Sequence, residues 1–160
     1  MFKYKIRRLE PKDIASAVRL IGQSLGDYDF KSAKSEVRNI FRKSAYKVYR
    51  FVDTFVIESD GKVIGYGGIW AMRCDPKTFA MTDWLAIDED YRRMGLGTTL
   101  MRFLFRRAKS KGIKHIYVET SADNRLALGF YKKCKFKRLC SIPNYYDESQ
   151  DLVMLLKTLK

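Results

Sequence analysis

The sequence predicts an α+β domain with a mixed, mostly antiparallel sheet of six to seven strands and helices on both faces. Three observations predict this fold. Short runs alternate apolar and polar residues as strands do, other segments repeat apolar residues every three to four positions as helices do, and turn residues separate the two kinds at short intervals. With 160 residues, of which 46% are hydrophobic, the chain is large enough for one packed domain spanning residues 1–160.

The first half of the chain predicts a strand, two helices and a three-stranded meander. Pro11 favours a helix start, and the apolar residues after it lie on one helical face. The dipeptide Asp60-Gly61 favours a tight hairpin turn between two strands. In order, the expected elements are a strand at 2–8, a helix from Pro11 to Leu25, a shorter helix at about 33–41, and strands at 51–58, 63–71 and 78–87.

The second half predicts a long helix, a strand, a short helix and a closing strand pair. Gly112 ends the long helix, because glycine readily takes the left-handed conformation found after helix C-termini. In order, the expected elements are a helix at 95–111, a strand at 113–120, a helix at 124–133, and strands at 136–142 and 151–157. The complete order is βααβββαβαββ, in which a meander is followed by one βαβ crossover.

The net charge of +14 is unevenly placed. Fourteen of the Lys and Arg residues lie between Arg92 and Arg138, where Glu119 and Asp123 are the only acids, so this stretch alone carries +12. A surface this basic attracts polyanions such as nucleic acid, the ribosome, anionic lipid or a phosphorylated cofactor. A solvated basic surface that binds no partner is the alternative.

The chain has no segment that approaches the ~20 apolar residues of a membrane span. The strand pattern at 2–8 also differs from the apolar core of a signal peptide, so we expect a cytoplasmic protein without a membrane partner. Cys74, Cys134 and Cys140 form no CxxC pair. We therefore expect reduced thiols and no metal site.

Residues 83–100, DWLAIDEDYRRMGLGTTL, contain the parts needed to hold a pyrophosphate. Gly95 and Gly97 free backbone N–H groups at the start of a helix, and Arg92 and Arg93 add positive charge beside them. Glycines recur at many strand-to-helix turns. A helix start that only needs close packing is therefore the alternative for this motif taken alone.

A second block, NRLALGFYKKCKF, follows the next expected strand and places Asn124, Tyr131 and Phe136 at fixed spacing. With the two blocks in this order, the chain resembles the GNAT superfamily of acetyl-CoA-dependent N-acetyltransferases over roughly Lys5 to Leu156. Its motif pattern is most similar to that of the ribosomal-protein and N-terminal protein acetyltransferases. The resemblance implies a single N-acetyltransferase domain with a GNAT-like sheet.

The resemblance also implies a coenzyme A site built from both blocks. Leu85 would offer its N–H to the thioester carbonyl, Ile87 would bond the pantetheine arm, and Tyr131 would sit beside the sulfur. Residues 93–98 would wrap the pyrophosphate. The implied cofactor-binding residues are Leu85, Ala86, Ile87, Arg92, Arg93, Met94, Gly95, Leu96, Gly97, Thr98, Asn124 and Tyr131.

Acyl transfer from a thioester to an amine needs a base for the amine proton and an acid for the leaving thiolate. Tyr131 suits the acid, because a phenol donates a proton while staying neutral at pH 7; a helix aromatic packed on the sheet is the alternative. The resemblance favours Glu119 as the base. Asp83 and a water relayed by backbone groups remain alternatives, and either carboxylate can instead be an ordinary surface charge.

The closing segment IPNYYDESQDLVMLLKTL resembles the last hairpin of the N-terminal acetyltransferases. There, the residues matching Tyr145 and Tyr146 line the peptide entrance, and one matching Asp151 precedes the last strand; ordinary surface anchoring is the alternative. Two positions depart from the family. Lys135 stands where a glycine of positive φ is common, and Met81 stands where histone-type members carry their base glutamate.

We interpret the chain as an enzyme that transfers acetyl directly, in a ternary complex, to a primary amine, with a protein or peptide α-amine preferred. Two alternatives stay open: a small-molecule acetyltransferase acting on an amino acid, polyamine or antibiotic, and a non-catalytic basic module that binds acetyl-CoA or nucleic acid. Acceptor choice is expected from the Gly26–Arg50 region and the Pro143–Gln150 loop. The sequence does not decide between a monomer and a homodimer.

Overall fold

The computed structural model describes residues 2–25, 34–35, 37–42 and 45–159. Its sheet has eight strands in the order β1-β2-β3-β4-β6-β8-β7, and β5 pairs with β3 beside this path. Neighbours are antiparallel except β4 and β6, which are parallel. The strands are β1 Lys5–Arg8, β2 Tyr49–Ser59, β3 Lys62–Met72, β4 Phe79–Thr82, β5 Ala86–Ile87, β6 His115–Ser121, β7 Lys137–Asp147 and β8 Gln150–Thr158.

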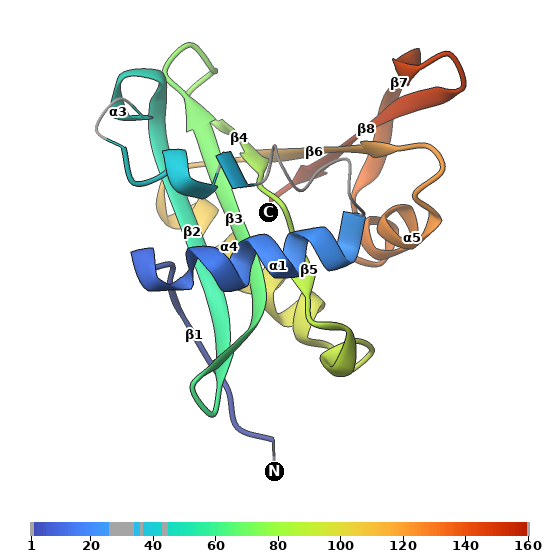
Figure 1. Cartoon of the computed structure of the whole chain (residues 1–160). Helices are drawn as coiled ribbons and strands as arrows, with labels where there is room; N and C mark the ends of the chain where they lie inside the picture. The colour runs from blue at the N-terminus through green and yellow to red at the C-terminus, as the bar shows by residue number, and fades with distance from the viewer. Residues whose placement is uncertain (1, 26–33, 36, 43–44, 160) are drawn as a thin grey trace.

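Helices cover both faces of the sheet, as the sequence predicted (Figure 1). On one face, here called the α1 face, Leu20 and Ile21 of α1 pack with Val56 and Tyr66 of the sheet. On the other, the α4 face, helices α4 and α5 pack on a larger apolar cluster. The helices are α1 Ile14–Leu25, α3 Ala45–Val48, α4 Leu96–Ser110 and α5 Arg125–Lys133, with short 3-10 helices η1 at Pro11–Asp13 and η2 at Glu89–Tyr91.

The local turn predictions are confirmed. Asp60 and Gly61 both have positive φ, at 48° and 77°, which is the twist-compatible turn that joins β2 to β3. At the end of α4, Gly112 has φ 76°, and the N–H groups of Gly112 and Ile113 donate to the carbonyls of Lys109 and Ala108. These two bonds satisfy carbonyls that a helix end would otherwise leave open.

Three sequence predictions need correction or fall partly outside the described chain. The single strand expected at 78–87 is two strands, β4 and β5, so the sheet has eight strands rather than six or seven. The loop expected at 143–150 is largely strand, because β7 continues to Asp147. Of the helix expected at about 33–41, residues 34, 35 and 37–39 are helical, whereas 33 and 36 lie outside the described residues.

Candidate functional site

The parallel pair of strands at the centre of the sheet opens after a short contact. β4 pairs with β6 only through residues 79–81 and 115–117. Beyond Thr82 the chain breaks its pairing register with β3: Thr82 faces Ile69, but Ala86 faces Tyr66. Three residues, 83–85, therefore lie opposite two on β3, which is a β-bulge that turns the strand. This opening between β5 and β6 is the candidate site.

Backbone groups of β5 face the opening. The Asp88 N–H donates to the Ile64 carbonyl at 2.9 Å, so residue 88 points its backbone groups at β3. Backbone direction alternates along a strand, so Ile87 and Leu85 point theirs away from β3. The Ile87 carbonyl accepts from Arg92 Nε at 3.1 Å, whereas the N–H groups of Leu85 and Ile87 are left for a partner in the opening.

The N-terminus of α4 adds a second group of backbone donors. Arg93 and Gly95 have positive φ, 62° and 81°, and this curls the chain before the helix. The Thr99 N–H donates to the Gly95 carbonyl, and no side chain caps the helix. The N–H groups of Leu96, Gly97 and Thr98 therefore lack helical partners and form a site suited to an anion.

Gly97 is required by packing as well as by backbone approach. A Cβ on this residue would lie 3.3 Å from the Phe130 ring and 3.7 Å from the Ile87 side chain. Glycine thus lets α4, α5 and β5 meet closely beside the donors. The tightly packed helix start, the alternative for this motif, is therefore present, and its use as a pyrophosphate cradle stays a prediction.

Arg92 is engaged within the protein. Its guanidinium donates to the Ile87 carbonyl, to the Gln23 carbonyl at 3.3 Å and to Ser24 Oγ at 3.5 Å. These bonds tie the end of α1 to β5, across 69 residues of sequence. Arg92, expected to bind the cofactor, therefore positions the two segments that border the opening. Arg93 and Met94 are exposed beside the anion site.

Asn124 is the N-cap residue of α5, and Tyr131 lies on that helix. The Asn124 side chain caps the helix by accepting the Ala127 N–H at 3.0 Å. Tyr131 is 8% exposed and packs edge-on against Phe130 and Phe136, each with a centroid distance of 5.4 Å. Burial raises the pKa of its phenol above the ordinary value. Among the described residues, its hydroxyl makes no hydrogen bond.

Glu119 lies on β6 with its side chain on the α1 face, since its neighbour Val118 packs on the α4 face. Burial raises the pKa of its carboxyl, and within the described ranges no ion pair offsets this. Tyr117, two residues earlier on the same face, was not singled out from the sequence. Its pKa is raised by burial and by the charges of Asp75 and Glu119, so it lies close to this carboxylate.

Asp83, the alternative base, is held by other groups. Tyr66 Oη donates to its Oδ2 at 2.7 Å, and the Trp84 N–H donates to its Oδ1 at 2.8 Å. Tyr66 is fully buried and was also missed in the sequence, where it is one apolar residue of a strand. Asp83 therefore fixes the bulge, whereas Glu119 has no such structural engagement.

The tyrosine pair of the closing hairpin is exposed. Tyr145 and Tyr146 are 55% and 39% exposed, with rings nearly perpendicular and centroids 5.1 Å apart. They lie on β7 where its pairing with β8 is interrupted between Ile142 and Asp147. Asp151 holds this irregular stretch by accepting the Asn144 N–H at 3.0 Å, so its role is within the hairpin.

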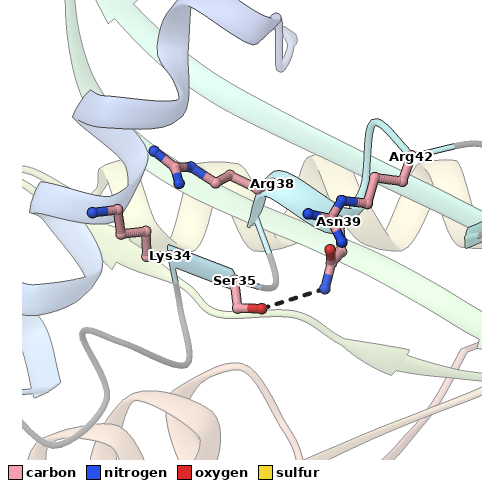
Figure 2. A pocket seen from close by; sticks show the side chains of 5 residues that line it. All are labelled: Lys34, Ser35, Arg38, Asn39 and Arg42. Atoms are coloured by element: carbon pink, nitrogen blue, oxygen red, sulfur yellow. Dashed lines mark hydrogen bonds between the residues drawn. The ribbon is translucent and has the colours of Figure 1, made fainter.

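A basic pocket of about 220 Å³ lies on residues 34–42 (Figure 2). Its segment packs on the α1 face, because Val37 is buried beside Val56 and Tyr66. The only hydrogen bond drawn there joins Ser35 and Asn39 at 3.4 Å. The pocket holds three cations and no carboxylate, with lining residues Lys34, Ser35, Arg38, Asn39 and Arg42.

Comparison with known proteins gives one family. Residues 24–136 match the model of the acetyltransferase (GNAT) family. A Bacillus subtilis protein, provisionally named ribosomal protein bS18-alanine N-acetyltransferase, is 34% identical over 105 residues, which are 65% of this chain and 67% of that protein. The N-alpha-acetyltransferase of Sulfurisphaera tokodaii is 29% identical over 116 residues, 66% of this chain and 68% of that one.

The fold itself is shared with solved acetyltransferases. An aminoglycoside 6′-N-acetyltransferase complexed with coenzyme A superposes with a TM-score of 0.78, over 98% of this chain and 97% of that one, at 15% sequence identity. At this identity the likeness concerns the fold alone. No helix of the described chain is long and apolar enough to cross a membrane.

We predict that Tyr66→Phe destabilises the protein by about 1–3 kcal/mol, because the Asp83 carboxylate loses a donor inside the sheet. Urea unfolding at pH 7 measures the change. Tyr4→Phe is the matched control, since Tyr4 is 41% exposed and its hydroxyl donates to no described residue; its free energy of unfolding should stay within about 0.5 kcal/mol of wild type. Equal effects of the two substitutions would contradict a structural role for the Tyr66–Asp83 bond.

Proposed function

The chain belongs to the GNAT acetyltransferase family, and from this premise we propose that it transfers an acetyl group from acetyl-CoA to the N-terminal α-amine of a protein or peptide. The observation that carries the proposal is the open sheet itself. We infer that the unpaired backbone N–H groups of β5, the uncapped N-terminus of α4, the buried Tyr131 phenol and the Glu119 carboxylate all border this opening.

The residues present fit coenzyme A. In this proposal the N–H groups of residues 96–98, with Arg93 beside them, hold the pyrophosphate, while the N–H of Ile87 holds the pantetheine arm. Ala86 and Asn124 line the cofactor site beside these groups. The Leu85 N–H donates to the thioester carbonyl oxygen, where negative charge develops. Acetyl-CoA supplies the acetyl group as an activated thioester.

Glu119 acts as the general base. An α-amine has a pKa of about 8, so most of it is protonated at pH 7 and must lose a proton before it attacks. Burial raises the pKa of Glu119 toward that of the amine, which makes the carboxylate a better proton acceptor. It takes the proton directly or through one water, while Asp83 stays bound to Tyr66 and Trp84.

Tyr131 is the proton donor for the leaving sulfur. Because burial raises its pKa, the phenol stays protonated at pH 7 and keeps its O–H as a donor. Glu119 first passes the ammonium proton to water, so that it is ionised again when the neutral amine attacks. As the N–C bond forms and the C–S bond breaks, the phenol proton moves to the sulfur and the second amine proton moves to Glu119. Exchange with water then returns a proton to the tyrosine and removes this second proton from the glutamate, so that one proton is released overall.

Tyr145 and Tyr146 are proposed to line the acceptor entrance, because each joins a flat apolar face to a hydroxyl and both are exposed. The names of the two relatives support an α-amine on a protein. The test is mass spectrometry of products after incubation with acetyl-CoA and two sets of acceptors. One set has peptides with a free N-terminus, and the other has N-blocked lysine peptides, aminoglycosides and polyamines.

Acetylation at the α-amine of the first set supports the proposal, and the blocked peptides control for lysine side chains. Products found only among the small amines would contradict the proposal that the acceptor is a peptide, but would still support acetyltransferase activity. If no product forms and acetyl-CoA does not bind, the proposal that the protein is an acetyltransferase is wrong.

We predict that Glu119→Gln lowers kcat by about 10²- to 10⁴-fold with little change in acetyl-CoA affinity. It should also raise the free energy of unfolding at pH 7. Because burial raises the folded-state pKa, ionisation of Glu119 opposes folding once the pH exceeds the unfolded pKa of about 4.3. The gain over wild type therefore vanishes below that pH. Glu89→Gln, at an exposed carboxylate, should change neither quantity.

We predict that Tyr131→Phe lowers turnover by about 10²-fold or more, because the sulfur loses its proton donor. The affinity for acetyl-CoA, measured by calorimetry, should stay nearly the same, since the ring and its packing are retained. The unfolding midpoint should also be unchanged, because the hydroxyl donates to no described residue. Unchanged turnover would remove Tyr131 from the mechanism.

A further inference from the structure

One exposed surface on the α4 side of the molecule is strongly basic and takes no part in the proposed chemistry. We call it the outer basic surface. It consists of Arg102, Arg106 and Lys109 on α4, Lys133 and Lys135 at the end of α5, and Lys157 on β8. Five of its six side chains are exposed and Lys157 is half-buried.

The α4 part is a stripe on the solvent side of the helix. Leu100, Leu104 and Ala108 bury the opposite side in the core, so residues 102, 106 and 109 point outward. At 1.5 Å per residue they are spaced about 6 and 4.5 Å along the helix axis. None of α4, α5 or residues 132–141 contains an Asp or Glu.

Contacts in the structure make the surface continuous from α4 to β8. Lys157 Nζ lies 6.0 Å from the centroid of the Phe105 ring on α4, and that ring lies 5.9 Å from Phe136. Burial raises the pKa of the Cys134 thiol, and the charges of Arg102, Lys133 and Lys157 oppose that rise, as expected if they surround one sulfur.

These cations differ from the basic residues beside them, which have structural partners. Arg107 Nη2 lies 2.9 Å and Lys111 Nζ 3.5 Å from the buried Asp53 carboxylate on β2. Within the described part of the chain, no member of the outer basic surface pairs with a carboxylate. Six like charges held together on one surface repel one another, and a polyanion would relieve that repulsion.

We propose that the outer basic surface binds the phosphate backbone of duplex nucleic acid without regard to sequence. The phosphate backbone of a duplex fits this surface because each strand presents one phosphate per 3.4 Å of helix axis. This spacing lets the cations of α4 each reach a phosphate. Single strands are bound largely by stacking on aromatic side chains, and no aromatic side chain of this surface is among the exposed ones.

The outer stripe of α4 also exposes no large apolar side chain, which an amphipathic helix lying in a lipid surface would need. Docking on this side leaves the α1 face uncovered, where Glu119 and the pocket of residues 34–42 lie. Duplex binding and acetyl transfer can therefore occur on one molecule at the same time.

The test is fluorescence anisotropy with a labelled 20-base-pair RNA duplex, and in parallel a DNA duplex, between 50 and 200 mM salt. For wild type, the logarithm of the association constant should fall linearly with the logarithm of the salt concentration. The slope should be roughly −0.9 for each phosphate contacted. In Arg102→Gln/Arg106→Gln/Lys109→Gln this slope should shrink by about 2–3, and the dissociation constant should rise at least tenfold. The RNA and DNA arms identify which duplex is preferred.

The matched control is Lys34→Gln/Arg38→Gln/Arg42→Gln, which removes the same charge from the α1 face and should change duplex affinity less than threefold. Equal losses in both variants would overturn the proposal, because net charge alone would then explain binding. Stronger binding of polyglutamate or of anionic vesicles than of either duplex would also overturn it. Should the α4 variant fail to fold, Lys133→Gln/Lys135→Gln/Lys157→Gln tests the same surface, with peptide acetylation as the check of folding.

Discussion

The hydrogen bond from the buried Tyr66 hydroxyl to the Asp83 carboxylate is the interaction on which the site depends. It holds the bulge at residues 83–85, where the chain leaves the register of β4 and enters that of β5. Without that change of direction, β4 would continue alongside β6, and its backbone N–H and C=O groups would form hydrogen bonds with β6. The opening, and the direction of the Leu85 and Ile87 N–H groups away from β3, both follow from this break.

The parallel pairing of β4 and β6 adds a second constraint. Parallel neighbours need a crossover connection, and here that connection contains α4. The helix therefore begins beside the opening, with its unpaired N–H groups available there. Gly97 allows α4 to approach α5 and β5, and Arg92 bonds the same region to the end of α1. The proposed cofactor and acceptor sides of the opening are thus mechanically linked.

The two faces of the sheet differ in the charged groups they carry. On the α1 face, Glu119 is half-buried and unengaged, which leaves it able to exchange a proton. On the α4 face, Arg107 and Lys111 neutralise the buried Asp53, and the remaining cations stay exposed. The opening accounts for only a small part of the net charge of +14. Six exposed or half-buried cations are on the outer basic surface, away from the proposed chemistry.

The sequence alone determined the features that depend on neighbouring residues. The turn at Asp60-Gly61 and the end of α4 at Gly112 were both readable, because each is set by conformational preferences over a few residues. Only the tertiary structure decided that one expected strand is two and that β7 runs through the tyrosine pair. It also decided that the Arg92 guanidinium binds the end of α1 and that the Asp83 carboxylate binds the Tyr66 hydroxyl. These last two contacts join residues 69 and 17 positions apart, and such contacts are selected by packing and burial rather than by local preference.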